Sequence, residues 1–228
     1  MPTALITGAN RGIGYEFARQ YSADGWKIHA GTRSLQNNPL LDELDQSLIS
    51  IHQLDIDDHA QIRALSEKLV GEPIDLLINN AGMCIDDDEY YGNFSDEQWM
   101  QQFRTHLFGS MAMCEAFVEN IANSNLKTII NISSGNGCFG IDRGKGLFPY
   151  DSSKSALNTI TKGMSVDLKD KGITVVSLTP GFVATDMGGQ DADLTPEESI
   201  TGMRHVIAGL DQSKTGSFIR HNGVVLPW

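Results

Sequence analysis

Three residues in the second half of the chain have the types and the spacing for proton chemistry. Tyr150 and Lys154 stand four residues apart, and Ser134 precedes the tyrosine by sixteen residues. Residues at this spacing project from one face of a helix and can act on a shared target. A phenol with a pKa of ~10 holds its proton too firmly at neutral pH unless a nearby cation favours the phenolate. Lys154 could supply that cation, and Ser134 could hydrogen-bond the oxygen of a reacting carbonyl.

The position of Ser134 strengthens this interpretation. It follows an apolar run, Thr128–Ile132, that is typical of a buried parallel strand. Its hydroxyl is therefore expected at the carboxyl end of a strand, where open α/β sheets bind ligands. A Tyr-x-x-x-Lys pair is common by chance, and a serine after a strand is often a cap or a turn. The order of the motifs along the chain favours chemistry.

The amino terminus predicts a phosphate-binding turn. A short apolar strand, Thr3–Thr7, leads into the sequence Gly8-Ala9-Asn10-Arg11-Gly12-Ile13-Gly14 and then into an amphipathic helix. Glycines let the backbone turn tightly near a pyrophosphate, while the free amides and the dipole at a helix start favour an anion. The spacing is Gly-x-x-x-Gly-x-Gly, which differs from the G-x-G-x-x-G dinucleotide pattern. The flanking strand and helix, more than the glycines, support the assignment.

Together these motifs resemble the short-chain dehydrogenase/reductase family. The matching segments are Thr7-Gly8-x-x-x-Gly12-Ile13-Gly14, Asn79-Asn80-Ala81-Gly82, Ser134, Tyr150-x-x-x-Lys154 and Pro180-Gly181. The carboxyl end, residues 216–228, is similar to the small carbonyl reductases related to sniffer and C-factor. The resemblance implies one nicotinamide-nucleotide-binding domain over residues 1–228. It also implies that Tyr150 is the general acid/base, that Lys154 lowers its pKa and binds the nicotinamide ribose, and that Ser134 orients the substrate oxygen.

Charge after the second strand favours NADP(H) over NAD(H). An NAD enzyme often places a carboxylate there for the ribose hydroxyls, whereas a 2′-phosphate needs a cation. Residues 32–34 are Thr-Arg-Ser, so Arg33 could grip a phosphate together with Arg11, although two solvated arginines are the alternative and NAD(H) stays open. The expected cofactor-binding residues are Gly8, Asn10, Arg11, Gly12, Ile13, Gly14, Arg33, Asp55, Ile56, Asn80, Ala81, Gly82, Tyr150, Lys154, Pro180, Gly181, Val183 and Thr185.

His106 departs from the family pattern. Relatives usually have an asparagine in the helix before the serine strand, where it helps carry protons through a water to the lysine. An imidazole can also hold a water and titrates near physiological pH, so His106 could replace that relay. The alternative is a histidine that only packs the helix.

The alternation of elements predicts a single α/β domain. Strands are expected at 3–6, 27–32, 50–54, 75–79, 126–132, 173–178 and 216–219, and the longest helices at 96–122 and 150–171. Such alternation is typical of βαβ units and of a Rossmann-type doubly wound parallel sheet with helices on both faces. With 228 residues and 40% hydrophobic content, the chain can bury a sizeable core.

Composition argues against several classes of partner. The net charge of −12 disfavours nucleic acid and anionic membranes, and the acidic run at 86–89 is expected to be a solvated loop. Three cysteines without paired spacing and dispersed histidines predict a reducing compartment and no metal site. The early first strand leaves no room for a leader, so a cytoplasmic protein is expected. By analogy with relatives, a homodimer or homotetramer is expected.

The sequence thus predicts an oxidoreductase that transfers a hydride between NADP(H) and a small-molecule carbonyl or alcohol. Two other classes stay open: a nucleotide-binding signalling protein with little turnover, and a lyase or epimerase with internal hydride transfer. Substrate walls are expected from the loop at 182–195 and from the glycine-containing insert at 138–148, where Phe139 and Phe148 could line an apolar site. Cys138 is interpreted as a passive thiol.

Overall fold

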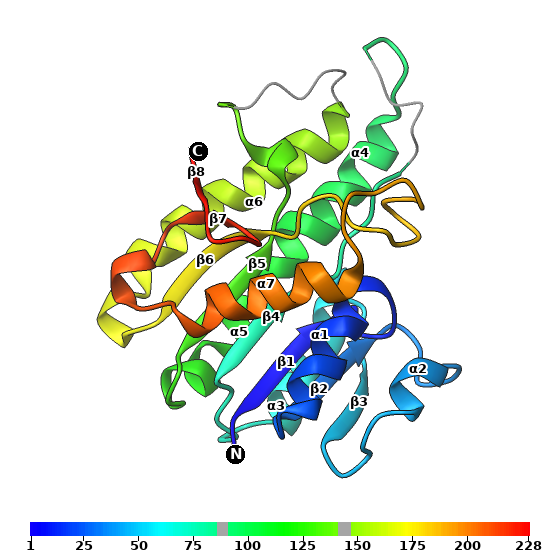
Figure 1. Ribbon diagram of the computed structural model, residues 1–228. Coiled ribbons are helices and arrows are strands. Elements are labelled where there is room, and N and C mark those ends of the chain that lie inside the picture. Colours follow the sequence, from blue (N-terminus) through cyan, green and yellow to red (C-terminus); the bar gives the residue numbers. More distant parts are fainter. Residues whose placement is uncertain (86–90, 141–146) are drawn as a thin grey trace.

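The strands form one sheet in the computed structural model, which describes residues 1–85, 91–140 and 147–228. The spatial order is β3-β2-β1-β4-β5-β6-β7-β8 (Figure 1), and every neighbouring pair is parallel except β7 and β8. The strands are β1 (Thr3–Thr7), β2 (Lys27–Thr32), β3 (Ile49–Gln53), β4 (Leu76–Asn79), β5 (Thr128–Ile132), β6 (Thr174–Thr179), β7 (Phe218–Arg220) and β8 (Val225–Leu226). The order changes direction between β1 and β4, which creates the crevice where such sheets bind ligands.

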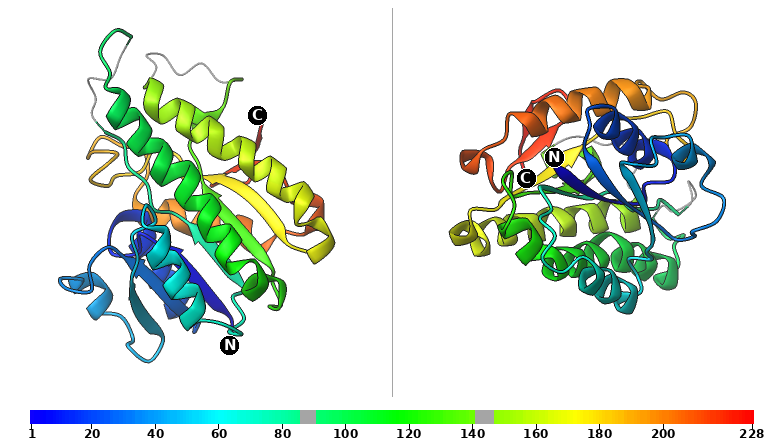
Figure 2. Two further views of the ribbon diagram at one scale, coloured as in Figure 1. Left: turned by 180° about the vertical axis from the view of Figure 1, so that it is seen from behind. Right: turned by 90° about the horizontal axis from the view of Figure 1, so that it is seen from below.

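Helices cover both faces of the sheet, so the molecule has three layers (Figure 2). Helices α1 and α7 lie on one face, and α3, α5 and α6 pack on the other. The helices are α1 (Gly12–Ala23), α2 (Pro39–Asp42), α3 (His59–Lys68), α4 (Asp96–Phe103), α5 (Ser110–Ala122), α6 (Phe148–Asp167) and α7 (Pro196–Ala208). Shorter turns are the π-helical segment η1 (Arg104–Gly109) and the 3₁₀ turns η2 (Gly135–Gly137), η3 (Lys169–Lys171) and η4 (Gln212–Lys214).

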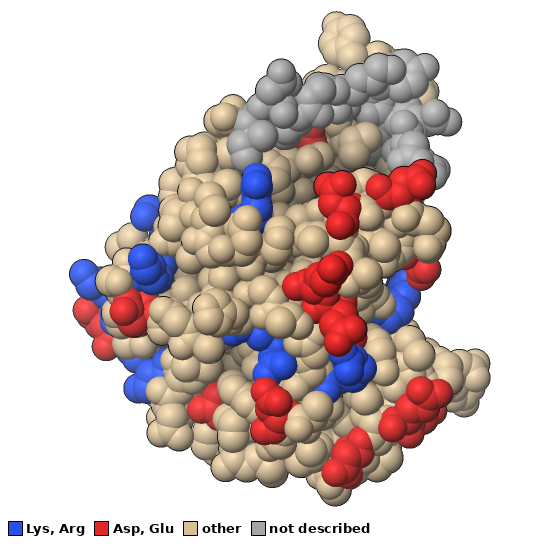
Figure 3. Space-filling model, in the orientation of Figure 1, with Lys and Arg blue, Asp and Glu red and all other residues tan. Residues whose placement is uncertain are grey.

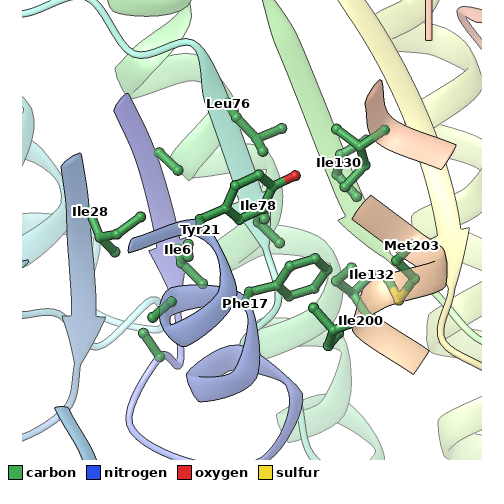
Figure 4. Packing of buried hydrophobic residues seen from close by; sticks show 14 of the residues in the cluster. Ile6, Phe17, Tyr21, Ile28, Leu76, Ile78, Ile130, Ile132, Ile200 and Met203 are labelled. Carbon is green, nitrogen blue, oxygen red and sulfur yellow. The ribbon is translucent and has the colours of Figure 1, made fainter. Parts of the chain in front are cut away.

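Alternation along the central strands supplies both cores. Ile6 and Ile78 face α1 and α7, where Phe17, Ile200 and Met203 pack on them (Figure 4). Their neighbours in sequence face the opposite way, toward α3 and α5, because successive strand side chains point to opposite faces. Both faces are buried, which explains why the strands are almost continuously apolar.

The predicted fold class is confirmed, and the strand positions agree within two residues at most ends. The range 27–32 coincides with β2, and the helix expected at 96–122 spans α4, η1 and α5 as one continuous rod. The π-helical turn within that rod and the antiparallel β8 were not predicted. A two-residue strand carries no readable periodicity, and residues 104–109 contain no sequence break before Gly109.

Some sequence predictions fall on residues outside the described part of the chain. These are the acidic run at 86–89 and two glycines of the insert, Gly144 and Gly146. Within the described ranges, no helix combines the length and the apolar character needed to cross a membrane. The same residues contain no group of three or more His, Cys, Asp or Glu side chains that could hold a metal ion.

Candidate active site

Helix α6 carries the tyrosine and the lysine. The helix begins at Phe148, and Pro149 in its first turn suits that position because proline lacks only an amide that would be unpaired there. Tyr150 lies in this first turn and Lys154 one turn later, beneath the ring, with its Nζ 5.6 Å from the ring centroid. The two side chains therefore meet as their spacing predicts.

Ser134 meets Tyr150 across the gap between β5 and α6. Its hydroxyl accepts a hydrogen bond of 3.1 Å from the amide of Asn136, which fixes the serine at the start of η2. Burial raises the pKa of Tyr150 to about 12, and the polar influence of Ser134, which favours the phenolate, offsets only part of that rise. The expectation of a lowered tyrosine pKa is therefore not met in this structure.

The Lys154 amine is held by the backbone at the end of β5. It donates to the carbonyl oxygen of Ile132 at 3.0 Å. The side chain is buried, and burial lowers the pKa of its ammonium group to about 8. Lys154 thus anchors α6 to the end of β5 while keeping its amine beside the tyrosine ring.

His106 completes the group from the opposite helix. Its ring is buried in η1 and makes an edge-on contact with Tyr150, with centroids 5.7 Å apart. Nε2 accepts from the amide of Met83 at 3.0 Å, and Nδ1 lies 2.8 Å from the hydroxyl of Ser153. Burial and the nearby Lys154 hold the pKa of His106 well below its usual value. Both ring nitrogens are engaged with the protein.

The glycine turn lies next to the Asn-Ala-Gly turn that follows β4. Gly8 and Gly12 adopt positive φ angles of 65° and 53°, which glycine tolerates without strain. A Cβ at Gly14 would lie 2.2 Å from the carbonyl oxygen of Gly8, so only glycine fits there. The Asn80 amide donates to the carbonyl oxygens of Thr7 and Gly8 at 2.8 and 3.2 Å. The two turns form one rigid unit at the carboxyl ends of β1 and β4.

The start of α1 fits an anionic group. The side chains of Asp58 and Thr195 cap α3 and α7, whereas that of Arg11 makes no capping bond to the described backbone. Because the first amides of a helix have no intrahelical partner, the α1 terminus can accept a phosphate. The residues of the turn therefore suit a dinucleotide.

The two candidate cations for a 2′-phosphate have different surroundings. Arg33 is exposed directly after β2. Arg11 is also exposed, and its guanidinium lies 3.2 Å from the carboxylate of Asp186 in the loop after β6. Both arginines are accessible to a phosphate. Arg11 would then pair with the 2′-phosphate in place of the Asp186 carboxylate.

Asp55 and Ile56 follow β3 as expected for an adenine pocket. Asp55 accepts from the amide of Asp57 at 3.1 Å, so its carboxylate shapes the local turn. Ile56 is buried against η1, where a Cβ at Gly109 would lie 2.9 Å from the Ile56 carbonyl oxygen. The structure brings these residues near the π-helical turn, a contact that sequence alone did not suggest.

The segment after β6 reaches back over the glycine turn. Gly181 has a φ of 82°, and the Pro180 carbonyl accepts from Ser199 of α7 at 2.8 Å. Val183 forms a bridge with Leu194, and the Thr185 methyl would lie 3.6 Å from a Cβ at Gly12. The remaining predicted contacts, Asn10, Ile13, Ala81 and Gly82, lie within the two turns.

Sequence reasoning missed three groups that hold the site together. Thr7 accepts from the amides of Asn80 and Ala81, both at 2.9 Å, while Met83 and Ser153 hold the two nitrogens of His106. Ser153 lies directly before Lys154, and its position between the two motif residues was the available signal. The roles of Thr7 and Met83 depend on distant contacts and had no such signal.

The expected substrate walls are only partly described. Phe139 and Phe148 are exposed, so neither side chain is part of the hydrophobic core. Cys138 is a free buried thiol whose Sγ donates to the Pro227 carbonyl at 3.0 Å, which agrees with a passive role. The carboxyl-terminal segment thus supports the loop between Ser134 and Tyr150.

Comparisons with known proteins agree with this geometry. The C-signal of Myxococcus xanthus is 33% identical over 171 residues, which cover 73% of this chain and 100% of that protein. The carbonyl reductase Sniffer of D. melanogaster superposes with a TM-score of 0.93 at 27% identity, covering 100% of both chains. An NADPH-bound carbonyl reductase from chicken fatty liver superposes with a TM-score of 0.90 at 30% identity, covering 100% of this chain and 99% of that one. The family model described as short chain dehydrogenase matches residues 2–194, and the chain therefore belongs to the short chain dehydrogenase family.

Proposed function

We propose that this oxidoreductase is a carbonyl reductase that uses NADP(H), with Ser134, Tyr150 and Lys154 at its reacting centre. The observation that carries the proposal is the placement of the Lys154 amine 5.6 Å from the centroid of the Tyr150 ring, with Ser134 at the adjoining end of β5. The group lies at the carboxyl end of β5, and the glycine turn lies at the carboxyl end of β1, two strands away in the same parallel sheet.

The residues of this chain have distinct tasks in carbonyl reduction. Bound NADPH supplies the hydride that reaches the carbonyl carbon. Ser134 hydrogen-bonds the substrate oxygen and holds it against the phenol of Tyr150. Tyr150 gives its proton to that oxygen, which becomes an alkoxide, a much stronger base than a phenolate. Because the pKa of Tyr150 is raised to about 12, the phenol is protonated at neutral pH, the form that reduction requires.

Lys154 has a structural and an electrostatic task. Its bond to the Ile132 carbonyl fixes the register of α6 against β5. Its cation lies beneath the phenol and stabilises the phenolate that remains after proton transfer. Rotation of the amine toward a cofactor ribose would leave the lysine close enough for this second task.

Removing the tyrosine hydroxyl tests the proposal directly. Tyr150→Phe should bind NADPH as the wild type does but lose turnover of ketones and aldehydes by roughly 10²–10⁴-fold, the usual contribution of a positioned general acid. Turnover is followed by loss of NADPH absorbance, and binding by fluorescence. Tyr21→Phe is the matched control, because that ring is also buried but lies in the α1 core. Unchanged turnover in Tyr150→Phe would discard the assignment.

Cofactor preference rests on Arg11 and Arg33. Both are exposed, and Arg11 lies in the glycine turn at the start of α1, which suits a phosphate. Solved relatives with NADP or NADPH bound share this fold. NADPH should therefore raise the melting temperature more than NADH at equal concentration, and Arg33→Gln should reduce the difference. Stronger stabilisation by NADH would reverse the preference.

A signalling role with little turnover is the second candidate, and the name of the C-signal relative is the observation that favours it. Such a protein would bind NADPH without consuming it in the presence of diverse ketones and aldehydes. Net consumption of NADPH favours the reductase and also excludes internal hydride transfer. Acidic side chains lie among the basic ones on the face shown in Figure 3, which disfavours nucleic acid as a partner of that face.

A further inference from the structure

The ring of His106 connects two parts of the site that are far apart in sequence. Because the Met83 amide is a donor, the Nε2 atom that receives it at 3.0 Å must be the unprotonated nitrogen. Nδ1 then carries the proton and donates to the Ser153 hydroxyl at 2.8 Å. That hydroxyl donates onward to the Tyr150 carbonyl at 2.7 Å. One neutral tautomer satisfies every group in this chain of bonds.

The two ends of the connection have different tasks. Met83 follows the Asn79–Gly82 turn, whose Asn80 clamps the glycine turn. Ser153 lies on α6, between Tyr150 and Lys154. Gly82 packs directly beneath the ring, since a Cβ there would lie 3.1 Å from Nε2. The histidine therefore holds the phosphate-binding side of the site at a fixed distance from the proton-donating side.

The π-helical turn places the ring. A π turn carries an extra residue, and such turns are frequent at functional sites. Within η1, Thr105 donates to Asp57 at 3.1 Å while His106 reaches toward α6, so two neighbouring side chains are anchored on opposite sides. Gly109 closes the turn tightly against Ile56. The backbone of η1 is thus held in the geometry that gives His106 both partners.

The surroundings of the ring disfavour a charged imidazole. A second proton on Nε2 would face the Met83 amide hydrogen, so two donors would oppose each other. Lys154 from α6 adds a neighbouring positive charge, and the ring is buried. Tyr150 contacts the ring with a neutral phenol edge. These contacts leave no nitrogen for a water that would carry protons.

We propose that His106 is a positioning residue, a neutral bridge between Met83 and Ser153 that sets Tyr150 and Lys154 against the cofactor side of the site. We call the Met83 amide, the His106 ring and the Ser153 hydroxyl the His106 bridge. This proposal rests on the proposed carbonyl reduction and replaces the relay role considered for His106. It assigns no proton transfer to the imidazole.

Two substitutions separate a bridge from a relay. His106→Gln keeps one donor and one acceptor on a neutral amide, whereas His106→Leu keeps the volume and loses both hydrogen bonds. For the bridge, we expect Gln to retain kcat within about threefold and Leu to lose about 10–100-fold, with the KM for NADPH changed less than kcat in both. Loss of activity in Gln as large as in Leu would contradict the bridge. His205→Leu, on the exposed side of α7, is the matched control.

The pH profile and the tautomer give further readouts. The pH profile of kcat should be the same in His106→Gln as in the wild type, because the imidazole does not titrate during turnover. Nitrogen-15 NMR of the His106 ring should show the Nδ1–H tautomer unchanged from pH 5 to 8. A ring that titrates near pH 6.5 would overturn the proposal. The NMR result does not depend on turnover, so it tests the bridge even if no carbonyl substrate is reduced.

Ser153→Ala keeps the test decisive if His106→Leu does not fold. It removes one end of the His106 bridge and should lower kcat by about 3–30-fold, with the same small change in KM. Combining it with His106→Gln should cause less loss than the product of the separate losses, because both act through one bond. Independent, multiplicative losses, or wild-type kcat in Ser153→Ala, would argue against the bridge.

Discussion

Lys154 and Lys68 each lie beside a buried histidine, but the two networks differ in how they compensate charge. Lys154 is itself buried next to His106, and its amine donates to the carbonyl of Ile132. Lys68 is exposed at the end of α3, and its amine lies 3.4 Å from Nδ1 of His52. One cation is held inside the protein, and the other remains in water.

The second network ends in a carboxylate. His52 lies 2.9 Å from His29, which in turn lies 3.0 Å from Glu72, and Lys27 pairs with the same carboxylate. The chain from Lys68 to Glu72 therefore runs from a cation to an anion, and a single set of neutral tautomers satisfies it. At the active site, the chain from Met83 through His106 ends at a backbone carbonyl, while the Lys154 cation is separate.

This difference distinguishes a network that supports folding from one that supports chemistry. A partly exposed ion pair with complementary partners stabilises its own charges, whereas a buried amine beside neutral groups is costly to ionise. The pKa of Lys154 is accordingly lowered to about 8. Under the proposed mechanism the site stabilises a transient phenolate, and a buried amine of this kind would serve that purpose at some cost in stability.

The largest expected effect comes from removing the lysine that we propose to be catalytic. Lys154→Met should reduce NADPH-dependent carbonyl turnover by at least about 10²-fold, because the phenolate formed after proton transfer loses its cation. The melting temperature should change little, because loss of the bond to the Ile132 carbonyl is offset when an apolar chain of similar length replaces a buried amine with a lowered pKa. Turnover assays and thermal denaturation of the same preparation check both parts. A large loss of stability with retained turnover would show that Lys154 supports folding and not chemistry.

Removing a histidine from the other network should have the opposite pattern. His52→Leu leaves the buried Nδ1 of His29 without its donor, which costs about 1–3 kcal/mol of unfolding free energy. Turnover per folded molecule should not change, because the pair lies between the sheet edge and α3. Urea denaturation and kcat measure the two quantities, with exposed His205→Leu as control. Reduced kcat at unchanged stability would show that the two networks are coupled.

Acid should destabilise the protein through the same pair. Burial lowers the pKa of His52 to about 4 and also lowers that of His29, from a usual value near ~6.5. Below pH ~6.5 the two histidines are protonated in the unfolded chain but not in the folded state. Their contribution to the unfolding free energy is therefore fully present above that pH and decreases as the pH falls toward 4. Denaturation at several pH values should show this decline, and a shallower decline in His52→Leu. Equal slopes in both proteins would remove His52 as the cause.

The sequence predicted the parts of the site that follow from local patterns. Strand, glycine turn and helix were placed correctly at the amino terminus, and i, i+4 spacing placed Tyr150 and Lys154 on one helix face. These features succeeded because periodicity and turn chemistry act over a few residues. The position of His106 within a long helix was also readable, but its two partners were not.

The missing information is long-range. His29 and His52 meet because parallel pairing of β2 and β3 places His52 opposite Gly31, two residues from His29 on the same face. No local pattern fixes that register. The orientation of the Lys154 amine likewise depends on the Ile132 carbonyl, and the π-helical turn around His106 depends on packing against Ile56. The sequence therefore placed Ser134, Tyr150 and Lys154 near one another but could not predict the contacts that set their pKa values.

The smallest expected effect tests Lys68, the exposed counterpart of Lys154. Lys68→Met should change unfolding free energy at neutral pH by less than about 0.5 kcal/mol and leave turnover intact, because solvent screens an exposed amine. At acid pH the direction of the change in unfolding free energy becomes informative. Lys68 is one of the cations that lower the pKa of His52, so its removal raises that pKa toward the usual value. The difference between the His52 pKa in the folded and the unfolded state then becomes smaller. The loss of stability between neutral pH and pH 5 should therefore be slightly smaller than in the wild type, whereas Lys214→Met on η4 should leave it unchanged. A cost above about 1 kcal/mol at pH 7 would mean that the exposed lysine is as tightly integrated as the buried one, and the contrast between the two networks would not hold.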